Sequence, residues 1–262
     1  TATNLLKCTH DWFVSMSRSM SVDVVYVDFS RAFDSIVHSK LLHKLAGYGV
    51  AGKLLQWIAV FLSNRTQRVV VENNMSDVAN VISGVPQGSV LGPILFIIFI
   101  NDIDSVCCGT TNIELFADDL KLYSEINLNG SGSIQQSLDK LTVWASEWQL
   151  SVNNSKCTVL NINDKGQSHC YSINNVALSS SSDVRDLGIN IDSELTFNNH
   201  IIDIVAKASQ RVGILFRGFV SRDLVLLRKA FITYIRPLVE YNTVIWNPNL
   251  IKHIDMIENV KR

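Results

Sequence analysis

Apolar residues recur along the chain at two different spacings, and each spacing predicts its own type of element. Spacings of three and four residues favour amphipathic helices over residues 4–19, 39–47, 51–63 and 133–150. The run DVVYVD at residues 23–28 is β-branched and aromatic, which is typical of a buried strand. This strand ends in a carboxylate.

The middle of the chain combines a polar turn, a loop and an apolar segment. Residues 66–73 and 77–82 favour a strand pair around the Asn-Asn sequence at 73–74. The run SGVPQGS at residues 83–89 carries two glycines and a proline, so it predicts a loop. The apolar stretch that follows predicts a helix over residues 90–104.

The last third of the chain changes from strands to helices. Residues 157–162 and 184–191 predict strands that are joined by a polar excursion. Helical spacing then covers residues 200–217, 222–235 and 237–246. The change predicts a boundary near residue 198. Because the chain opens on threonine and ends inside a helical pattern, we expect it to be a piece of a longer polypeptide.

Charge is unevenly distributed along the 262 residues. Lys and Arg number 23 against 24 Asp and Glu, which excludes a uniformly basic nucleic-acid coat. Residues 200–262, however, carry ten basic and five acidic residues, whereas residues 1–199 carry 13 and 19. The 47% hydrophobic content is enough for a packed core and excludes disorder of the whole chain.

Membrane and secretory functions are not favoured by the sequence. The most apolar run, residues 90–100, is short and contains Gly92 and Pro93, so it does not predict a membrane span. The five cysteines show neither a disulfide framework nor zinc-ligand spacing. We therefore expect an intracellular protein that is not secreted.

Three carboxylates lie at the ends of apolar strands. Asp28 ends the first strand, and Asp118 and Asp119 lie between the apolar runs 112–116 and 120–125, at the tip of a predicted hairpin. Carboxylates gathered beside buried strands need a cation, and Mg²⁺ prefers such oxygen ligands. Taken alone, an Asp-Asp pair is common and turns favour Asp, so this signal is weak by itself.

Five motifs in a fixed order strengthen this interpretation. They are VDFSRAFD at 27–34, SGVPQGSVLGP at 83–93, FADD at 116–119, WQLSVNNSKC at 148–157, and DLGINID at 186–192 with LTFNNH at 195–200. Together they resemble motifs A, B, C and D and the primer-grip region of reverse transcriptases of the non-LTR retrotransposon (LINE) type. The resemblance runs through nearly the whole chain.

The resemblance implies a fold and a reaction. The fold would be α+β: a right-hand polymerase palm over residues 1–197, with an antiparallel sheet backed by helices, then a truncated helical thumb over 198–262. Most of the fingers would be missing. The reaction would be RNA-directed DNA polymerisation, with two metal ions supporting nucleotidyl transfer from a dNTP to a primer 3′-hydroxyl.

The resemblance also implies roles for single residues. Asp28 and Asp118 would chelate two Mg²⁺ ions, or Mn²⁺, with the backbone carbonyl of Phe29 and the carboxylate of Asp119 completing the set. Lys156 would donate a proton to the leaving pyrophosphate or stabilise its charge. A solvated lysine at a strand edge is an equally good interpretation of Lys156.

Three further residues would contact the nucleotide. Phe33 would lie under the incoming sugar and collide with a 2′-hydroxyl, although an ordinary core aromatic is a credible alternative. Gln87 and Gly88 would contact nucleotide and template, with glycine allowing close approach. Without the other motifs, residues 83–88 would be a plain loop.

Basic residues of the last segment would hold phosphates of the template and primer duplex. They are Lys207, Arg211, Arg217, Arg222, Arg228, Lys229 and Arg236. The implied partners are an RNA template, a DNA primer, dNTPs and the rest of the retrotransposon polyprotein, with its fingers and endonuclease, and no membrane. The implied location is the nucleus during integration.

Two rival functions remain at this stage. The chain could be a non-catalytic remnant that only binds nucleic acid or is structural, which the missing fingers motivate. It could also be a metal-dependent nuclease that uses the same carboxylates. Nuclease chemistry, however, does not require the Pro-Gln-Gly loop or an aromatic residue at Phe33.

Overall fold

The computed structural model describes all residues except 127–129, 165–168, 222 and 262. By its internal contacts the chain divides into two units. Unit 1 comprises residues 1–22, 160–167 and 181–262, and unit 2 comprises residues 23–159 and 168–180. The predicted domain boundary at residue 198 stays a prediction.

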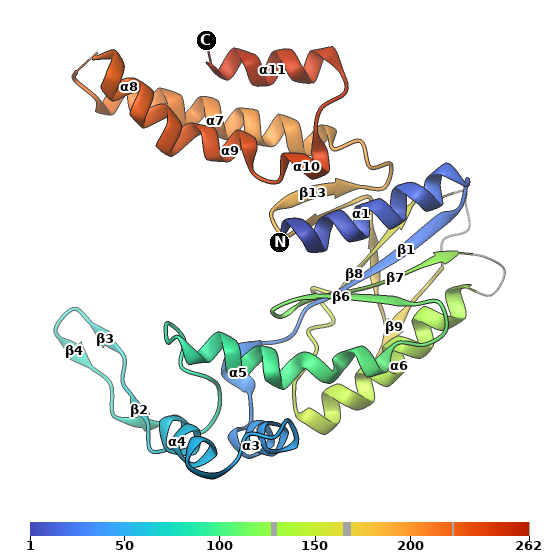
Figure 1. The fold of residues 1–262 in the computed structure, drawn as a ribbon, viewed down its shortest axis with the longest axis vertical. Coiled ribbons are helices and arrows are strands. Elements are labelled where there is room, and N and C mark those ends of the chain that lie inside the picture. The colour runs from blue at the N-terminus through green and yellow to red at the C-terminus, as the bar shows by residue number, and fades with distance from the viewer. Residues whose placement is uncertain (127–129, 165–168, 222, 262) are drawn as a thin grey trace. The chain divides into compact units, whose positions relative to one another are not determined.

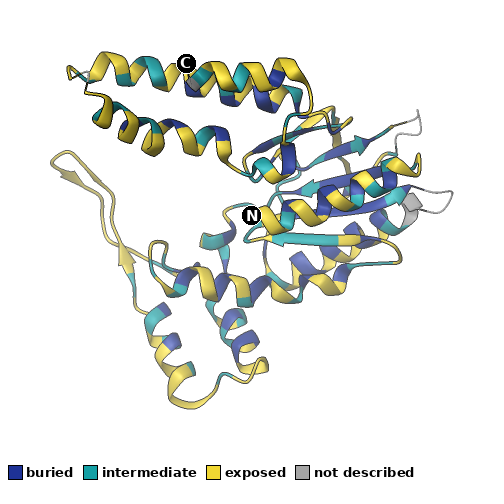
Figure 2. Ribbon diagram, turned by 45° about the horizontal axis from the view of Figure 1, so that its top comes forward, coloured by how far each residue is buried: buried dark blue, intermediate teal, exposed yellow. Residues whose placement is uncertain are grey.

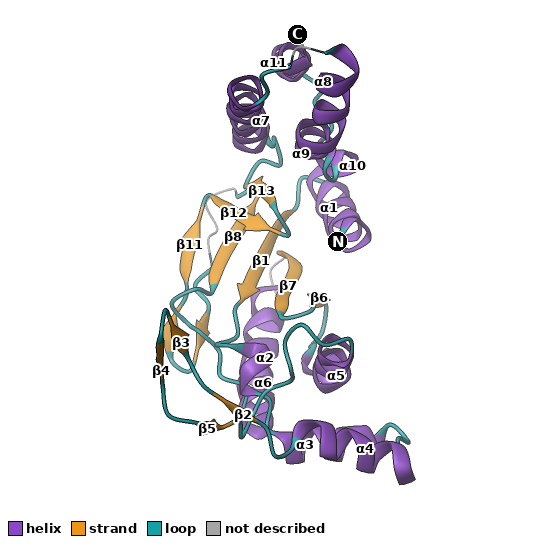
Figure 3. Cartoon of the chain, turned by 90° about the vertical axis from the view of Figure 1, so that its left-hand side faces the viewer, coloured by secondary structure: helices purple, strands orange, loops and turns teal. Residues whose placement is uncertain are grey.

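A five-stranded sheet carries the strand that was predicted to end in Asp28. Its strands lie in the order β11, β8, β1, β7 and β6 (Figure 3). Their bounds are β1 (Ser21–Val27), β6 (Asn112–Phe116), β7 (Asp119–Ile126), β8 (Thr158–Ile162) and β11 (Ser179–Ser181). β1 and β7 are buried over most of their length, and their buried positions include the polar residues Asp23, Lys121 and Ser124 beside the apolar ones.

Helices and short hairpins complete unit 2. The helices are α2 (Ala32–Ser35), α3 (His38–Gly47), α4 (Gly52–Leu62), α5 (Leu91–Ile100), the 3₁₀ helix η1 (Asn101–Val106) and α6 (Gly130–Trp148). The short strands are β2 (Thr66–Gln67), β3 (Val70–Val71), β4 (Asn74–Met75), β5 (Ala79–Asn80), β9 (Ser172–Ile173) and β10 (Val176–Ala177).

The core of unit 2 forms where α6 packs on β7 and η1, and α3 packs on α5. Along α6, Ile134, Leu138 and Leu141 recur at spacings of four and three, and all three are fully buried. α5 is apolar on every side, yet it still presents Phe96 and Phe99 to this core. These two side chains therefore anchor α5 to the core of unit 2.

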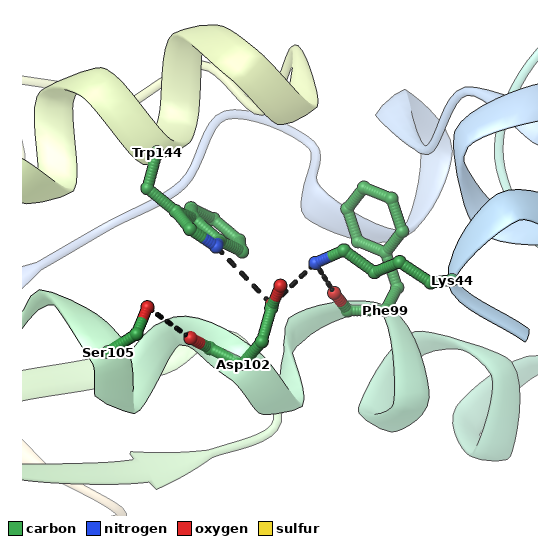
Figure 4. Close-up of polar contacts among 5 residues, drawn as sticks. All are labelled: Lys44, Phe99, Asp102, Ser105 and Trp144. Atoms are coloured by element: carbon green, nitrogen blue, oxygen red, sulfur yellow. Dashed lines mark hydrogen bonds and ion pairs between the residues drawn. The ribbon is translucent and has the colours of Figure 1, made fainter. Parts of the chain in front are cut away.

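A buried lysine joins α3 to three other helices of this core, α5, η1 and α6 (Figure 4). Lys44 on α3 donates to the backbone carbonyl of Phe99 and to the carboxylate of Asp102, both at 2.5 Å. The indole Nε1 of Trp144 on α6 donates to the same carboxylate at 3.3 Å. The ammonium also lies 3.7 Å from the ring centroid of Trp148. Burial lowers the pKa of Lys44, and Asp102 opposes that shift.

A β-ribbon extends from this unit between α4 and α5. β2 pairs with β5 and β3 pairs with β4, both antiparallel. All residues from 66 to 80 are exposed (Figure 2). The predicted strand pair is thus confirmed, but its turn lies at Glu72 and Asn73, one residue earlier than expected.

Unit 1 is largely helical in its later part. Its helices are α1 (Ala2–Ser17), α7 (Asn198–Gly218), α8 (Leu224–Ala230), the π-helix η2 (Phe231–Ile235), α9 (Arg236–Glu240), α10 (Thr243–Trp246) and α11 (Ile251–Lys261). Its hairpin consists of β12 (Asp183–Asp186) and β13 (Ile189–Asp192). α7 packs against α9 and α11, and α1 packs against α10.

Two predicted elements were wrong in detail. The single strand expected over 184–191 is the β12–β13 hairpin, because Leu187 and Gly188 both have positive φ and form a two-residue turn. The helix expected over 90–104 changes to 3₁₀ geometry at Asn101. Across the described residues, every helix is too short or too polar to cross a lipid bilayer.

Candidate active site

Asp28 and the acidic hairpin lie at the same end of the sheet. Asp28 directly follows β1, and 38% of its side chain is exposed. β1 and β7 are neighbours, and Figure 1 shows them running in opposite directions. The end of β1 therefore lies beside the start of β7, where Asp118 and Asp119 are found.

The hairpin tip presents the two aspartates through a strained backbone. Phe116 pairs with Asp119, so Ala117 and Asp118 form a two-residue loop. Ala117 has a φ of 54°, which costs a non-glycine residue about 1–2 kcal/mol. Strain of this kind is common where a fold has to present functional groups.

Residues 151–157 are held against the end of β1. The backbone N–H of Asn153 donates to the carbonyl of Asp28, and the N–H of Ser30 donates to the carbonyl of Ser151, each at 2.8 Å. The N–H of Asp28 points to the thiol of Cys157 at 3.5 Å. Burial raises the pKa of that thiol, so it stays neutral beside the aspartate.

This arrangement brings Lys156 close to Asp28. The Lys156 Nζ lies 3.7 Å from the Asp28 Oδ2, and both side chains are partly solvated. A lysine ammonium acts as a point charge on a flexible stem. In this position it can lower the negative potential of the carboxylates and reach a phosphate bound next to them.

The loop at residues 83–88 is fastened to the segment that follows Asp28. Gly84 donates to the Ile36 carbonyl at 2.8 Å and Val85 donates to the Phe33 carbonyl at 2.9 Å. A Cβ at Gly84, where φ is +81°, would lie 2.7 Å from the Cα of Asp34. Only glycine fits this contact without a backbone shift.

The three residues expected to contact the nucleotide lie on these two joined segments. Phe33 is partly buried and stacks on Phe96, with ring centroids 4.1 Å apart. Gln87 is exposed and donates from Nε2 to the Asp34 Oδ1 at 2.8 Å. A Cβ at Gly88 would meet nothing within 4 Å, so the space beside that backbone is open.

The donor set at this end of the sheet fits a hard divalent cation. Its side-chain donors, Asp28, Asp118 and Asp119, offer only carboxylate oxygens, which Mg²⁺ and Mn²⁺ accept. Within the described part of the chain there is no group of three or more His, Cys, Asp or Glu that could hold a metal ion. A cation here would therefore need substrate phosphates and water to complete its ligands.

The predicted phosphate-binding residues of α7 are exposed, but not all of them are free of other contacts. Lys207, Arg211 and Arg217 all lie on the solvent side of the helix. Lys207 and Arg211 line a cavity of about 310 Å³ together with Arg185. Arg211 also donates from Nη1 to the carbonyl of Tyr234 in the π-helix, at 3.3 Å. It thus has a structural contact besides any role with phosphate.

Sequence reasoning assigned no supporting role to the residues that hold the motifs in place, although three of them lie inside the motifs. Cys157 and Asn153 support Asp28, and the His38 imidazole bonds the Gly84 carbonyl at 2.8 Å. Asp192 accepts from the N–H groups of Thr196 and Phe197, which anchors the turn into α7. No spacing rule would have identified them, because their partners are distant in sequence or lie on the backbone.

Comparison with known proteins identifies the family of the chain. Residues 7–191 match the family described as reverse transcriptase (RNA-dependent DNA polymerase), so the chain belongs to that family. The "RNA-directed DNA polymerase from mobile element jockey" of Drosophila melanogaster is 32% identical over 188 residues, covering 68% of this chain and 20% of the relative. The corresponding jockey protein of Drosophila funebris is 31% identical with the same coverage.

A longer match comes from a second mobile element. The "Probable RNA-directed DNA polymerase from transposon X-element" of Drosophila melanogaster is 26% identical over 247 residues, covering 90% of this chain and 27% of the relative. The resemblance to reverse transcriptases of non-LTR elements is thereby confirmed. The chain spans about a fifth to a quarter of the length of these relatives.

Solved structures support the fold. An apo telomerase from Candida tropicalis, truncated from its C-terminal domain, aligns with a TM-score of 0.53 at 15% identity, covering 75% of this chain and 38% of that chain. A telomerase from the same organism in complex with a telomeric RNA fragment aligns with a TM-score of 0.53 at 11% identity, covering 99% and 52%. The α+β polymerase fold class is confirmed, and at these identities the likeness concerns the fold alone.

Proposed function

We propose that this chain is the catalytic palm of an RNA-directed DNA polymerase. The primer 3′-hydroxyl attacks the α-phosphate of a bound deoxynucleotide, a new phosphodiester bond forms, and pyrophosphate leaves. The observation that carries the proposal is the placement of Asp28 at the end of β1 beside the Asp118–Asp119 hairpin, at one end of one sheet. Family membership and five motifs in order support the same reaction.

The metal ions would be held by oxygen donors of this chain. Asp28, Asp118 and Asp119 would supply carboxylates, and Phe29 would supply its backbone carbonyl. Two Mg²⁺ ions, or Mn²⁺, held by these donors would supply stabilisation of the negative charge that develops during nucleotidyl transfer. Lys156, at 3.7 Å from the Asp28 carboxylate, would donate a proton to the leaving pyrophosphate or stabilise its charge.

We assign the selection of deoxynucleotides over ribonucleotides to Phe33. Its ring is stacked on Phe96, which limits the ways in which it can move aside. A 2′-hydroxyl on the incoming sugar would collide with a ring held in this way. Gln87 and Gly88 would contact nucleotide and template, and the open space beside Gly88 supports a close approach there.

The nucleic acid would be an RNA template paired with a DNA primer, held through its phosphates by Lys207, Arg211 and Arg217. Their exposure on one helix supports this assignment. Other parts of the polyprotein, including fingers and an endonuclease, would complete the enzyme. We propose that the enzyme acts inside the cell, in the nucleus during integration, where the target DNA lies.

Primer extension tests the proposal. A polypeptide carrying this chain, with fingers supplied, should extend a DNA primer on RNA in the presence of dNTPs and Mg²⁺. Asp118→Asn should abolish extension, whereas Asp77→Asn on the exposed ribbon should leave it unchanged. Normal extension by Asp118→Asn would overturn the mechanism.

The same preparation separates the rival functions. Salt-sensitive duplex binding without extension would identify a non-catalytic remnant that binds nucleic acid. Degradation of labelled RNA in the absence of nucleotides would identify a nuclease.

A further inference from the structure

Asp34 closes the first motif, and no part of the proposed mechanism uses it. Two groups of the 83–88 loop nevertheless bind it. The Ser83 Oγ donates to its backbone carbonyl at 2.8 Å, and the Gln87 Nε2 donates to its carboxylate Oδ1 at 2.8 Å. Through the second bond, a carboxylate six residues after Asp28 contacts the side chain to which we assign nucleotide contact.

We propose that Asp34 is a positioning residue that fixes the amide orientation of Gln87. A primary amide has a donor end and an acceptor end, and it can rotate by half a turn at little cost in shape. An ionised carboxylate can only accept, so it binds the NH₂ end alone. Gln87 is therefore held with its carbonyl oxygen directed away from Asp34 and available to a hydrogen-bond donor of the bound nucleotide.

The role is one of orientation, since other bonds fasten the loop independently. Gly84 and Val85 donate from their backbone N–H groups to the carbonyls of Ile36 and Phe33, and His38 bonds the Gly84 carbonyl. None of these contacts involves the Asp34 carboxylate. Both partners of the Asp34–Gln87 bond are exposed, so its loss should shift the melting temperature by no more than about 4 °C.

The inference rests on the proposed function, and primer extension can test it. In an active polypeptide, Asp34→Ala should raise the KM for dNTP about tenfold and change kcat by less than about threefold, because the lost interaction is with bound nucleotide. Asp34→Asn should have a smaller effect, since its carbonyl can still accept from Gln87 in one of two orientations. Gln87→Ala should match Asp34→Ala.

The double variant decides whether Asp34 acts through Gln87. If it does, Asp34→Ala in the Gln87→Ala background should add no further rise in KM. An undiminished effect in that background, or a normal KM in Asp34→Ala, would overturn the proposal. Asp139→Ala is the matched control, because Asp139 accepts from Gln135 Nε2 at the same 2.8 Å on α6, and its KM should be normal.

A second readout does not depend on activity. In ¹⁵N-labelled protein, the hydrogen-bonded Nε2 proton of Gln87 should resonate downfield and lose that shift in Asp34→Ala, but not in Asp139→Ala. An unchanged resonance would overturn the positioning role even if the polymerase proposal holds. If the downfield shift is lost in Asp34→Ala but the parent protein fails to extend primers, the positioning role of Asp34 holds and the proposed polymerase function is wrong.

Discussion

The buried lysine of unit 2 gives the sharpest test of how the helices are held together. Lys44 has 4% of its side chain exposed and donates to the carbonyl of Phe99 and the carboxylate of Asp102. Lys44→Met keeps an unbranched apolar stem of similar length, with sulfur in place of one methylene, and removes the ammonium. The substitution removes the two bonds of Lys44 shown in Figure 4 and, with them, the cation–π contact to Trp148.

The expected change in the free energy of unfolding follows from the interactions that Asp102 and the Phe99 carbonyl lose. Breaking a buried ion pair by removing one member costs about 3–5 kcal/mol. Asp102 is 37% exposed, so water recovers part of its solvation and the lower end of that range applies. The Phe99 carbonyl loses a donor, worth about 1 kcal/mol, while the desolvation penalty of the ammonium disappears. We expect a net loss of about 2–3 kcal/mol in the free energy of unfolding.

Urea unfolding followed by tryptophan fluorescence measures this loss, because Trp144 and Trp148 flank the ammonium. With an m-value of about 2 kcal/mol per molar urea, the midpoint should fall by about 1–1.5 M. The double variant Lys44→Met/Asp102→Asn should have a free energy of unfolding within about 1 kcal/mol of that of the parent protein, because no unpaired charge remains. Lys53→Met, at an exposed lysine of α4, should change stability by less than about 0.5 kcal/mol.

Two outcomes would refute the reasoning about Lys44. A Lys44→Met protein as stable as its parent would mean that the ion pair contributes nothing beyond its desolvation penalty. A double variant less stable than Lys44→Met would mean that the Asp102 carboxylate is not the group left unpaired.

Further predictions concern glycine, histidine and cysteine positions. Gly92→Ala should lower the free energy of unfolding in urea by at least about 2 kcal/mol, because the new Cβ would lie 2.5 Å from the Pro86 carbonyl oxygen. Gly213→Ala on α7 should raise it by up to about 1 kcal/mol, because nothing lies within 4 Å of the new Cβ. Equal effects of the two substitutions would contradict the packing argument. Burial lowers the pKa of His200 from 6.5 to about 4, so between these pH values the unfolded chain binds a proton that the folded chain does not bind. The free energy of unfolding should therefore fall as the pH drops from about 6.5 toward 4, by about 2 kcal/mol at pH 5. A His200→Phe protein should lack that part of the pH dependence of the urea midpoint, and a persisting slope would assign it to other groups. The Cys157 thiol, buried and with a raised pKa, should react with iodoacetamide at least about tenfold more slowly than exposed Cys170, and mass spectrometry of the labelled sites would detect the contrary order.

Strong local signals made much of the fold predictable. The spacing of apolar residues located α1, α3, α4 and α7 to within about two residues, because each buries one face and each spacing repeats over several turns. The β12–β13 hairpin was missed because its turn is Leu-Gly rather than Asn-Gly, so the usual turn signal was absent. The change to 3₁₀ geometry after α5 has no signal of its own in the sequence.

The motifs, their order and the identity of the acidic, aromatic and glycine residues were determined by the sequence alone, because chemistry depends on residue type and strand ends can be recognised locally. Only the tertiary structure decided which groups meet. Lys156 lies at Asp28 because residues 151–157 bond to the end of β1, and Gln87 has one amide orientation because Asp34 lies opposite it. These contacts join residues 53 or more positions apart, and such distances in space follow from packing and not from spacing along the chain.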